Sequence, residues 1–528
     1  MAMNLLPLRG SPGRVRWLRA AIWGGVTLVA VGGVVAGCAP PPAAAPLPSE
    51  IRIGFSAFST SRGEGLRLLS GTLYGESLLT LGWDGQVIPL LAESWEWLDA
   101  GRTLRLQLRP GLKFHDDQPV TAEVVSRIID AQIARLRENS FPGFDYVEKV
   151  QPLDERVVVI TMSRPDTFLI NSLDQLLITQ EKDGRSVGTG PFVITPGTPP
   201  ASGLVAERFA AYHRGPAGIA RVKVVPYDTQ RSAFTALMRG DVDMVPDVAR
   251  ESVEFLQGAS RIDLYPSLRP FYVPLVFSLR HPVFRRVEVR RALSEAIDRD
   301  QIVKVAMRGH GRVAQDPVWP HHWAYSAATR AHGYNPEAVR LRLDAMGLPV
   351  RPAPAGSNRM ASRFRFTCLY WSEDPEFERI ALLVQRQLAA VGIDMALEPV
   401  KTADLSARVG AGNFEAHLFR MNGGRSFAST YYFWHSPEGM HNTLHDSGYS
   451  GSDAILERIR VARTDDETRR AVSDLQQQFY DDAPAVFLAW LESTRAVDAQ
   501  FALGQRNDPD IFAHLWQWRP AGQQKASR

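Results

Sequence analysis

The stretch RFRFTCLY at residues 363–370 is typical of a β-strand, and IDMALE at residues 393–398 is typical of a second one. Residues 375–391 between them carry apolar side chains at helical spacing, and Gly392 stands where such a helix would end. The apolar stripe of this helix consists of Ile380, Leu383, Val384, Leu388 and Val391. Strand, helix and strand at this spacing predict a βαβ crossover and therefore a locally parallel sheet.

A different pattern lies nearer the N-terminus. Residues 103–109 (TLRLQLR) alternate apolar and polar side chains, which predicts a strand with one buried face. A helix is predicted from Thr121 onward, with an apolar stripe made by Val124, Val125, Ile128, Ile129, Ile133 and Leu136. At 528 residues the chain is too long for one hydrophobic core. We therefore expect an α/β protein with additional antiparallel strands and a bilobed body.

Residues 1–37 are predicted to be an export signal. A region with three arginines precedes an apolar segment at 20–35, which is too short for a permanent span of about 20 residues. Small residues stand directly before Cys38, as in a lipoprotein signal peptide, where this cysteine is lipidated after cleavage. An uncleaved anchor is the alternative. Residues 38–49 (CAPPPAAAPLPS) then form an extended tether, and the body is expected outside the cytoplasm, in the periplasm or cell envelope.

The charge of the chain argues against a nucleic-acid-binding protein, and its cysteine content argues against a disulfide-stabilised one. The formal charge of +3 becomes −1 once the four arginines of the export signal are removed, so no basic field remains that could attract a nucleic acid. The chain has two cysteines, Cys38 and Cys368, and lipidation of Cys38 leaves Cys368 without a disulfide partner. Because Cys368 lies in an apolar strand pattern, we expect a buried and unreactive thiol.

Common catalytic motifs are absent from the sequence. It contains no HExxH, no GxSxG, no SxxK and no phosphate-binding loop of the GxxxxGK[ST] type. We therefore expect neither an enzyme nor a cofactor. A periplasmic hydrolase is the alternative from another functional class, because catalytic triads are assembled in space rather than in sequence.

A histidine-rich segment at residues 435–446 is the candidate metal site. His441 and His445 are four residues apart and would share one face of a helix, where they could bind a metal ion. Pro437 and Gly439 favour a loop instead. Solvated loop histidines are therefore the main interpretation, and metal ligation is the alternative.

Three segments resemble a family signature. LAESWE at 91–96, LRPGLKFHDD at 108–117 and PVTAEV at 119–124 are similar to the pattern LAESW…LRPGVKFHDGTPLTAEDV of the family-5 bacterial extracellular solute-binding proteins. These are the dipeptide-, oligopeptide- and nickel-binding components of ABC importers. Later landmarks of the family follow in order, namely GTGPF at 188–192, GDVD at 240–243, VRRAL at 289–293 and AIDR at 296–299. The resemblance runs from about Tyr74 to Leu488.

The resemblance implies a bilobed periplasmic-binding-protein fold of the class II type with an extra inserted subdomain in the first lobe. We expect lobe I to consist of residues 50–72, 187–268 and 490–528, the inserted subdomain of 73–186, and lobe II of 269–489. The chain should cross between the lobes near Pro266–Tyr272 and Leu488–Arg495. The signature, with His115, Asp116 and Asp117, is expected to be structural and remote from the ligand.

The implied function is capture of a solute by hinge closure and its delivery to the permease of an ABC importer, by a monomer anchored to the membrane through its lipid. Peptide-binding relatives pair the ligand's ammonium with an Asp in the second lobe. The matching stretch here, FRMNGGRSF at 419–427, holds no acid, and Gly424 or Arg425 occupies the position of the Asp. An ordinary peptide with a free amino group is therefore disfavoured.

We expect a peptide-like or other small polar solute, which includes anionic ones. Arg425 and Arg408 would suit a carboxylate or phosphate, Asn422 a polar group, and Trp371 and Tyr431 would supply aromatic walls. Each of these side chains could instead be a surface or core residue. The alternative within the class is a metal–chelate binder of the nickel type.

Overall fold

The computed structural model describes residues 49–56, 71–137, 142–195, 203–328, 330–356, 359–436, 446–502 and 514–521. The export signal, Cys38, nearly all of the tether, His441 and His445 lie outside these residues, and what concerns them stays a prediction. Within the described ranges, no helix combines the length and the apolar character needed to cross a membrane.

The predicted βαβ unit is confirmed. Strand β16 (Phe364–Trp371) leads into helix α9 (Pro375–Ala390) and strand β17 (Ile393–Val400), and β16 and β17 pair in parallel. The carboxylate of Asp374 caps α9 by accepting a hydrogen bond from the backbone N–H of Glu376 at 2.9 Å. Gly392 ends the helix with φ 82°, a left-handed conformation that favours glycine.

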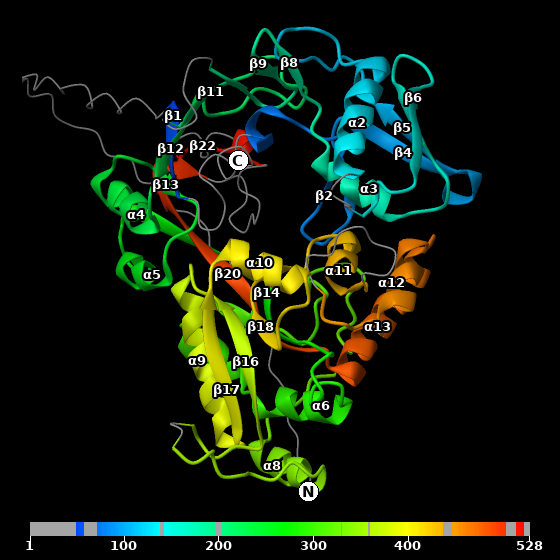
Figure 1. Cartoon of the computed structure of the whole chain (residues 1–528). Helices are drawn as coiled ribbons and strands as arrows, with labels where there is room; N and C mark the ends of the chain where they lie inside the picture. The colour runs from blue at the N-terminus through cyan, green and yellow to red at the C-terminus, as the bar shows by residue number, and fades with distance from the viewer. Residues whose placement is uncertain are drawn as a thin grey trace, which may run out of the picture. The chain divides into compact units, whose positions relative to one another are not determined.

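This unit belongs to a 12-stranded sheet with the main order β10-β11-β12-β1-β13-β20-β14-β18-β16-β17. Two long strands hold its halves together, β14 (Ile262–Phe277) and β20 (Ala485–Asp498), which pair antiparallel with each other. β20 also pairs with β13, and β14 also pairs with β18 and β19. Figure 1 shows β20 running from β13 towards β14 and β18. The chain therefore crosses between the halves along β14 and β20.

We call the half around β1 lobe I and the half around β16 lobe II. Lobe I contains β1 (Glu50–Ser56), β10 (Phe192–Ile194), β11 (Leu204–Arg208), β12 (Arg221–Tyr227), β13 (Met244–Val245), α4 (Gln230–Arg239) and α5 (Arg250–Leu256). Lobe II contains α6 (Val287–Ala296), β15 (Gly311–Val313), α8 (Pro336–Ala345), α10 (Thr402–Gly410), β18 (Ala416–Leu418), β19 (Met421–Asn422), α11 (Phe427–Trp434), α12 (Asp453–Arg460) and α13 (Asp465–Asp482). The residue boundaries expected from the resemblance stay a prediction.

The core of lobe I combines both ends of the described chain. Ile51 and Ile53 of β1 pack in one buried cluster with Val497 of β20 and with Leu515 and Trp518. β1 pairs in parallel with β12 over its whole length, from Glu50↔Arg221 to Ser56↔Tyr227. The cluster is completed only by the C-terminal residues, so lobe I is discontinuous in sequence.

A separate four-stranded sheet forms the inserted subdomain. Its order is β4-β5-β7-β6, and helix α2 packs against it. The elements are β4 (Ala92–Leu98), β5 (Thr103–Leu108), α2 (Ala122–Arg137), β6 (Val147–Pro152) and β7 (Val157–Met162). Leu104, Leu106 and Leu108 are fully buried, which confirms the predicted one-sided strand. His115 hydrogen-bonds the carbonyl oxygen of Gly190 at 2.9 Å and thereby ties the signature to the 188–192 turn.

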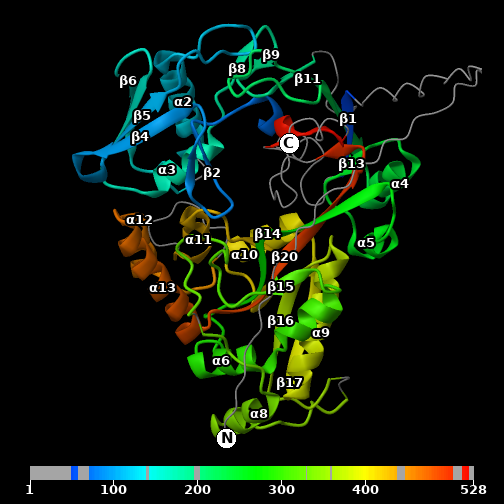
Figure 2. The ribbon, with the colours of Figure 1, turned by 180° about the vertical axis from the view of Figure 1, so that it is seen from behind.

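The inserted subdomain also contacts lobe II. Arg460 of α12 forms a buried ion pair with Asp166, with a nitrogen–oxygen distance of 2.6 Å and side-chain exposures of 2% and 0%. Asp166 precedes α3 (Phe168–Ser172), and Figures 1 and 2 both show α3 beside α11. Across the same contact, the backbone N–H of Thr167 donates to the carbonyl oxygen of Arg460 at 2.8 Å.

Candidate functional site

The two crossing strands lose their regular pairing between Leu268 and Tyr272, and a second, smaller irregularity lies between Val273 and Pro274. Leu268 stands opposite Glu492 and Tyr272 opposite Trp490, so three residues of β14 (Arg269, Pro270 and Phe271) face a single residue of β20. The carbonyl oxygen of Pro270 accepts a hydrogen bond from the N–H of Gly423 at 2.9 Å. This bulge therefore holds the lobe II segment at 419–425, the segment that sequence analysis singled out.

Arg420 lies in an aromatic frame next to the bulge. Its guanidinium lies 5.1 Å from the ring centre of Trp371 and 5.6 Å from that of Phe271. The side chain is partly buried, and this burial lowers the pKa of Arg420, while the carboxylates of Asp374 and Asp247 oppose the shift. The positive charge of Arg269 acts in the same direction as burial.

Asp247 brings a carboxylate from lobe I into this group. It follows β13, and the N–H of the next residue, Val248, donates to the carbonyl oxygen of Thr494 on β20 at 2.8 Å. Burial raises the pKa of Asp247 to about 6, against the opposing effect of Arg269 and Arg250. Among the described residues its carboxylate accepts one hydrogen bond, a long one of 3.3 Å from the side-chain amide of Gln230.

The two neighbouring arginines, Arg250 and Arg269, differ in whether a carboxylate pairs with them. Arg250 forms a bidentate ion pair with Glu376 at the start of α9 and also donates to the carbonyl oxygen of His310 at 2.6 Å. Arg269 is partly buried, and among the described residues its guanidinium has neither a hydrogen bond nor an ion pair. Neither Asp247 of lobe I nor Arg269 of the crossing strand β14 forms an ion pair among the described residues, although the charge of Arg269 acts on Asp247.

Two of the five predicted ligand-binding residues lie near Arg420. Trp371 is fully buried beneath its guanidinium and donates its indole N–H to Glu373 at 3.1 Å. Asn422 pairs with Phe271, and its side-chain oxygen accepts a hydrogen bond from the N–H of Gly424 at 2.8 Å. Trp371 thus supports the site from below, and Asn422 shapes the turn beside it.

The other three predicted residues lie elsewhere. Arg408 forms an ion pair with Glu398 on β17. Arg425 donates to the carbonyl oxygen of Leu81 in the inserted subdomain at 2.6 Å. Tyr431 is buried, donates to Glu457 at 2.6 Å and packs against Phe168, with 5.5 Å between ring centres. Their contact with a ligand stays a prediction, as does that of Trp371 and Asn422.

Sequence reasoning did not select Asp247, Arg269 or Arg420. Arg269 lies inside the crossing expected at 266–272, and Arg420 lies inside the quoted 419–427 segment. Asp247 follows the GDVD landmark at 240–243 by four residues. The expected crossing, the quoted segment and the landmark therefore indicate the parts of the chain in which these three residues lie. That lobe I approaches the 419–425 segment can be seen only in the three-dimensional structure.

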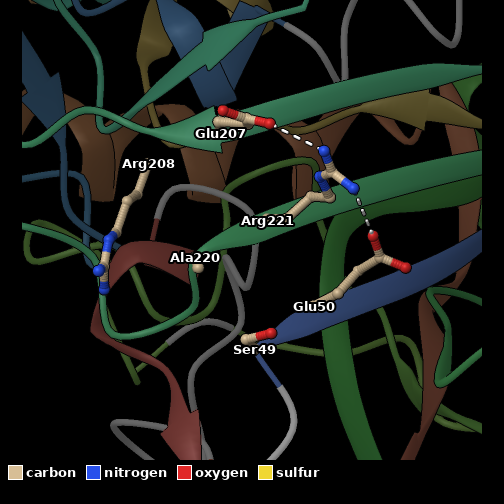
Figure 3. Close-up of a pocket in the computed structure, with 6 residues that line it drawn as sticks. All are labelled: Ser49, Glu50, Glu207, Arg208, Ala220 and Arg221. Atoms are coloured by element: carbon tan, nitrogen blue, oxygen red, sulfur yellow. Dashed lines mark hydrogen bonds and ion pairs between the residues drawn. The ribbon is translucent and has the colours of Figure 1, made fainter.

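Two hollows lie away from this charged group. The larger, of about 430 Å³, is lined by Ser49, Glu50, Glu207, Arg208, Ala220 and Arg221. Figure 3 shows the guanidinium of Arg221 held between Glu207 and Glu50, while the side chain of Arg208 lies apart from them. The smaller, of about 200 Å³, lies beside Trp490 and is lined mainly by the loop at 312–325. Neither joins residues of lobe I to residues of lobe II.

Metal-ligand clusters and reactive thiols are not found in the described part of the chain. No group of three or more His, Cys, Asp or Glu side chains is close enough there to hold a metal ion. Cys368 is fully buried, as expected, and burial raises the pKa of its thiol.

Comparisons with known proteins agree on one family. Residues 86–441 match the family described as bacterial extracellular solute-binding proteins, family 5. The probable D,D-dipeptide-binding periplasmic protein DdpA of Escherichia coli is 26% identical over 428 residues, which cover 75% of this chain and 78% of DdpA.

Solved structures agree with the fold. A putative peptide-binding protein AppA from Clostridium difficile is similar with a TM-score of 0.77 and 17% identity, over 89% of this chain and 100% of that one. NikZ from Campylobacter jejuni, solved in complex with Ni(L-His), is similar with a TM-score of 0.72 and 16% identity, over 89% and 99% of the chains. These likenesses confirm the expected α/β bilobed fold class with its inserted subdomain.

Proposed function

Because the chain belongs to the family-5 bacterial extracellular solute-binding proteins, we propose that it captures a small polar solute between its two lobes and delivers it to the permease of an ABC importer. The observation that carries this proposal is the charged group at the bulge of the crossing strands. Asp247 comes from lobe I, Arg420 from lobe II, and Arg269 from the strand between them.

Hinge closure is the physical mechanism that we propose. β14 and β20 connect the lobes, and their interrupted pairing at residues 269–271 is a place where the backbone can bend. A solute that contacts both lobes binds the closed arrangement more tightly than an open one, so it shifts the population by that difference in affinity. The permease would then recognise the closed arrangement.

Location and assembly are part of the same proposal. Relatives such as DdpA are described as periplasmic, which supports a periplasmic site of action for this chain. The small residues before Cys38 and the Pro/Ala-rich tether favour a lipid anchor, and we propose a monomer without catalytic activity. A nickel-chelate ligand stays the alternative, and no described residue cluster favours it.

Solution scattering with and without solutes tests the proposal. The body from residue 39 onward would be purified, unfolded and refolded to remove bound ligand, and screened by thermal shift against dipeptides, carboxylates, sugars and nickel–histidine chelate. We expect one solute class to raise the melting temperature without being consumed and to reduce the radius of gyration. Turnover of the stabilising solute would favour a hydrolase, and stabilisation by no class of solute would contradict the proposal.

A further inference from the structure

Helices α5 and α9 are joined across the two lobes by a buried ion pair. Arg250 is the first residue of α5 in lobe I, and Glu376 lies in the first turn of α9 in lobe II. One guanidinium nitrogen of Arg250 lies 2.8 Å from a carboxylate oxygen of Glu376, and a second nitrogen contacts the other oxygen. The two side chains are only 16% and 7% exposed. This pair therefore connects the lobes directly, in addition to the crossing strands.

The position of this pair relates it to solute capture. Helix α5 follows the carboxyl end of β13, and α9 follows the carboxyl end of β16. In open α/β sheets, ligands bind in the crevice outside the carboxyl ends of the strands. Arg250 and Glu376 therefore come from the parts of the two lobes between which a solute is expected. Because they belong to different lobes, their contact depends on how closely the lobes approach each other.

The geometry of the pair favours the closed arrangement. A buried ion pair compensates for the loss of water around its charges only if its geometry is good and its remaining polar atoms are bonded. Here the contact is bidentate, and the third guanidinium nitrogen of Arg250 donates to the carbonyl oxygen of His310 in lobe II at 2.6 Å. Glu376 lies at the start of α9, where the helix dipole stabilises a negative charge. Both conditions are therefore met at Arg250.

Exposed charges of opposite sign surround the buried pair. Glu251 of α5 lies 3.5 Å from both Arg308 and Arg379 of lobe II, and Glu254 lies 3.7 Å from Arg308. Exposed ion pairs of this kind contribute little individually. Together they place an acidic face of lobe I opposite a basic face of lobe II, so the two faces attract each other before the buried pair forms.

The lobe II segment that meets α5 has an irregular backbone. Residues Ile302–Ala306 form a π-helix, and Arg308 has φ 54°, a left-handed conformation that is uncommon for a residue with a Cβ atom. The carbonyl oxygen of His310 accepts the hydrogen bond from Arg250, and the guanidinium of Arg308 lies beside Glu251. Irregular backbone of this kind is frequent at functional sites. Its contacts with α5 give this segment a part in the approach of lobe I.

We propose that Arg250 and Glu376 form a closing latch that brings the two lobes together in the absence of a solute. The proposal rests on the proposed function and names the side chains of the protein that contribute to hinge closure. Because the protein's own charges join the lobes, a solute has to supply only part of the free energy of closure.

A latch has a different signature from a residue that contacts the solute. Loss of the latch lowers the closed population itself, so it weakens the binding of every solute by the same factor. Loss of a solute contact weakens only the binding of those solutes that make the contact. Arg250 and Glu376 are therefore positioning residues, and the closed population of the ligand-free protein reports their action.

Single-molecule energy transfer between two dyes on the ligand-free protein tests this proposal. Met238→Cys on α4 and Leu341→Cys on α8 place the dyes at exposed positions of lobe I and lobe II, in a refolded Cys38→Ser protein. Cys368 is fully buried and does not compete for the dyes. The measured quantity is the fraction of molecules in the closed arrangement.

We expect a measurable closed population beside the open one without any solute. Arg250→Gln should lower the closed fraction at least about 10-fold, because closure would then bury Glu376 without a cation. Arg250→Lys, which keeps the charge but not the bidentate contact, should lower it less and serves as the second variant if Arg250→Gln folds poorly. Arg342→Gln is the matched control and should leave the closed fraction unchanged, because Arg342 forms a bidentate pair with Glu295 inside lobe II.

The same variants are then tested with solutes. For each dipeptide, carboxylate, sugar or nickel–histidine chelate that raises the melting temperature of the native sequence, the dissociation constant is measured with the native sequence and with Arg250→Gln. We expect Arg250→Gln to weaken all of them by one common factor.

Three results would overturn the latch. The first is the absence of a closed population without solute, the second is an equal closed fraction in Arg250→Gln and the native sequence, and the third is an equal loss in Arg250→Gln and Arg342→Gln. Compaction of the protein by a solute would leave the proposed function intact in each case. Failure of every solute to bind or to compact the protein would instead contradict the proposed function and remove the role of the latch with it.

Discussion

The contact between the inserted subdomain and lobe II includes a buried charge, the guanidinium of Arg460, and the effect of its removal can be calculated. In Arg460→Met, Asp166 loses the guanidinium nitrogens at 2.6 and 2.9 Å and keeps only the N–H of Phe168 at 2.9 Å. Loss of one partner of a buried ion pair costs about 3–5 kcal/mol. This protein has another outcome besides unfolding, because separation of the inserted subdomain from lobe II returns Asp166 to water.

We therefore expect Arg460→Met to open this contact while each core stays folded. The assay is hydrogen exchange at the amides of Thr167 and Trp323, which donate across the contact to Arg460 and Asp84 at 2.8 and 2.9 Å. A cost of 3–5 kcal/mol corresponds to about a 150- to 5,000-fold loss of protection. Amides of β16 and β17, which lie within lobe II, should keep their protection.

Arg458→Met is the matched control on the same helix. Its guanidinium pairs with Asp474 at the surface, where both side chains are about half exposed, and such pairs contribute about 0–1 kcal/mol. Asp166→Leu added to Arg460→Met should restore much of the protection, because apolar replacements of buried ion pairs are tolerated. Unchanged protection of Thr167 in Arg460→Met, or a loss equal to that of Arg458→Met, would refute this reasoning.

Three further outcomes can be measured directly. Burial raises the pKa of Asp247 from 3.8 to about 6. The protonated carboxyl therefore contributes its full stability to the fold below pH 3.8, and this stability is lost as pH rises through 6. Ionisation of Asp247 at pH 8 lowers the free energy of unfolding by at most about 3 kcal/mol, or by about 1 kcal/mol once the partial exposure of the side chain to solvent is taken into account. Ligand-free Asp247→Asn should therefore melt above the native sequence at pH 8, by a smaller margin at pH 5, and alike near pH 3, where the carboxyl is protonated in both folded and unfolded chains; a lower melting temperature at pH 8 would contradict this. Gly423→Ala places a Cβ atom 2.5 Å from the ring of Trp490 and should cost about 1–3 kcal/mol in urea unfolding, whereas Gly333→Ala, in open space, should cost little. In a Cys38→Ser protein, Cys368 should react with a thiol reagent at pH 8 only after unfolding, because its side chain is fully buried; rapid reaction of the folded protein would be the contrary result.

Local sequence patterns predicted those helices and strands whose buried face can be read from the spacing of apolar residues within the element itself. The βαβ unit at 363–398 and the strand at 103–109 were readable because their apolar periodicity reports directly which face is buried. The crossing near 266–272 came from the family resemblance, and β14 does span that stretch. The family signature at 91–124 lies in the inserted subdomain, where it is bonded to the 188–192 turn.

Candidate site residues were harder to predict, because their partners are distant in sequence. Arg425 is bonded to a residue 344 positions away, and Tyr431 packs on Phe168 of the inserted subdomain. Arg408 has its charge neutralised by Glu398 across the junction of β17 and α10. No periodicity reports such long-range pairing, so arginine and aromatic side chains read from one segment could be assigned a chemistry but not a partner.

The sequence-discontinuous core of lobe I imposes an order on how this protein becomes native. During export the N-terminal strand β1 emerges early, yet its cluster lacks Val497 and Trp518 until almost the whole chain has followed. The continuous stretch from β14 to β20 can pack its own core before that moment. β1 can pair with β12 once residue 227 has emerged, but its buried cluster stays open on the side of Val497, Leu515 and Trp518, so the last residues to arrive complete the first lobe.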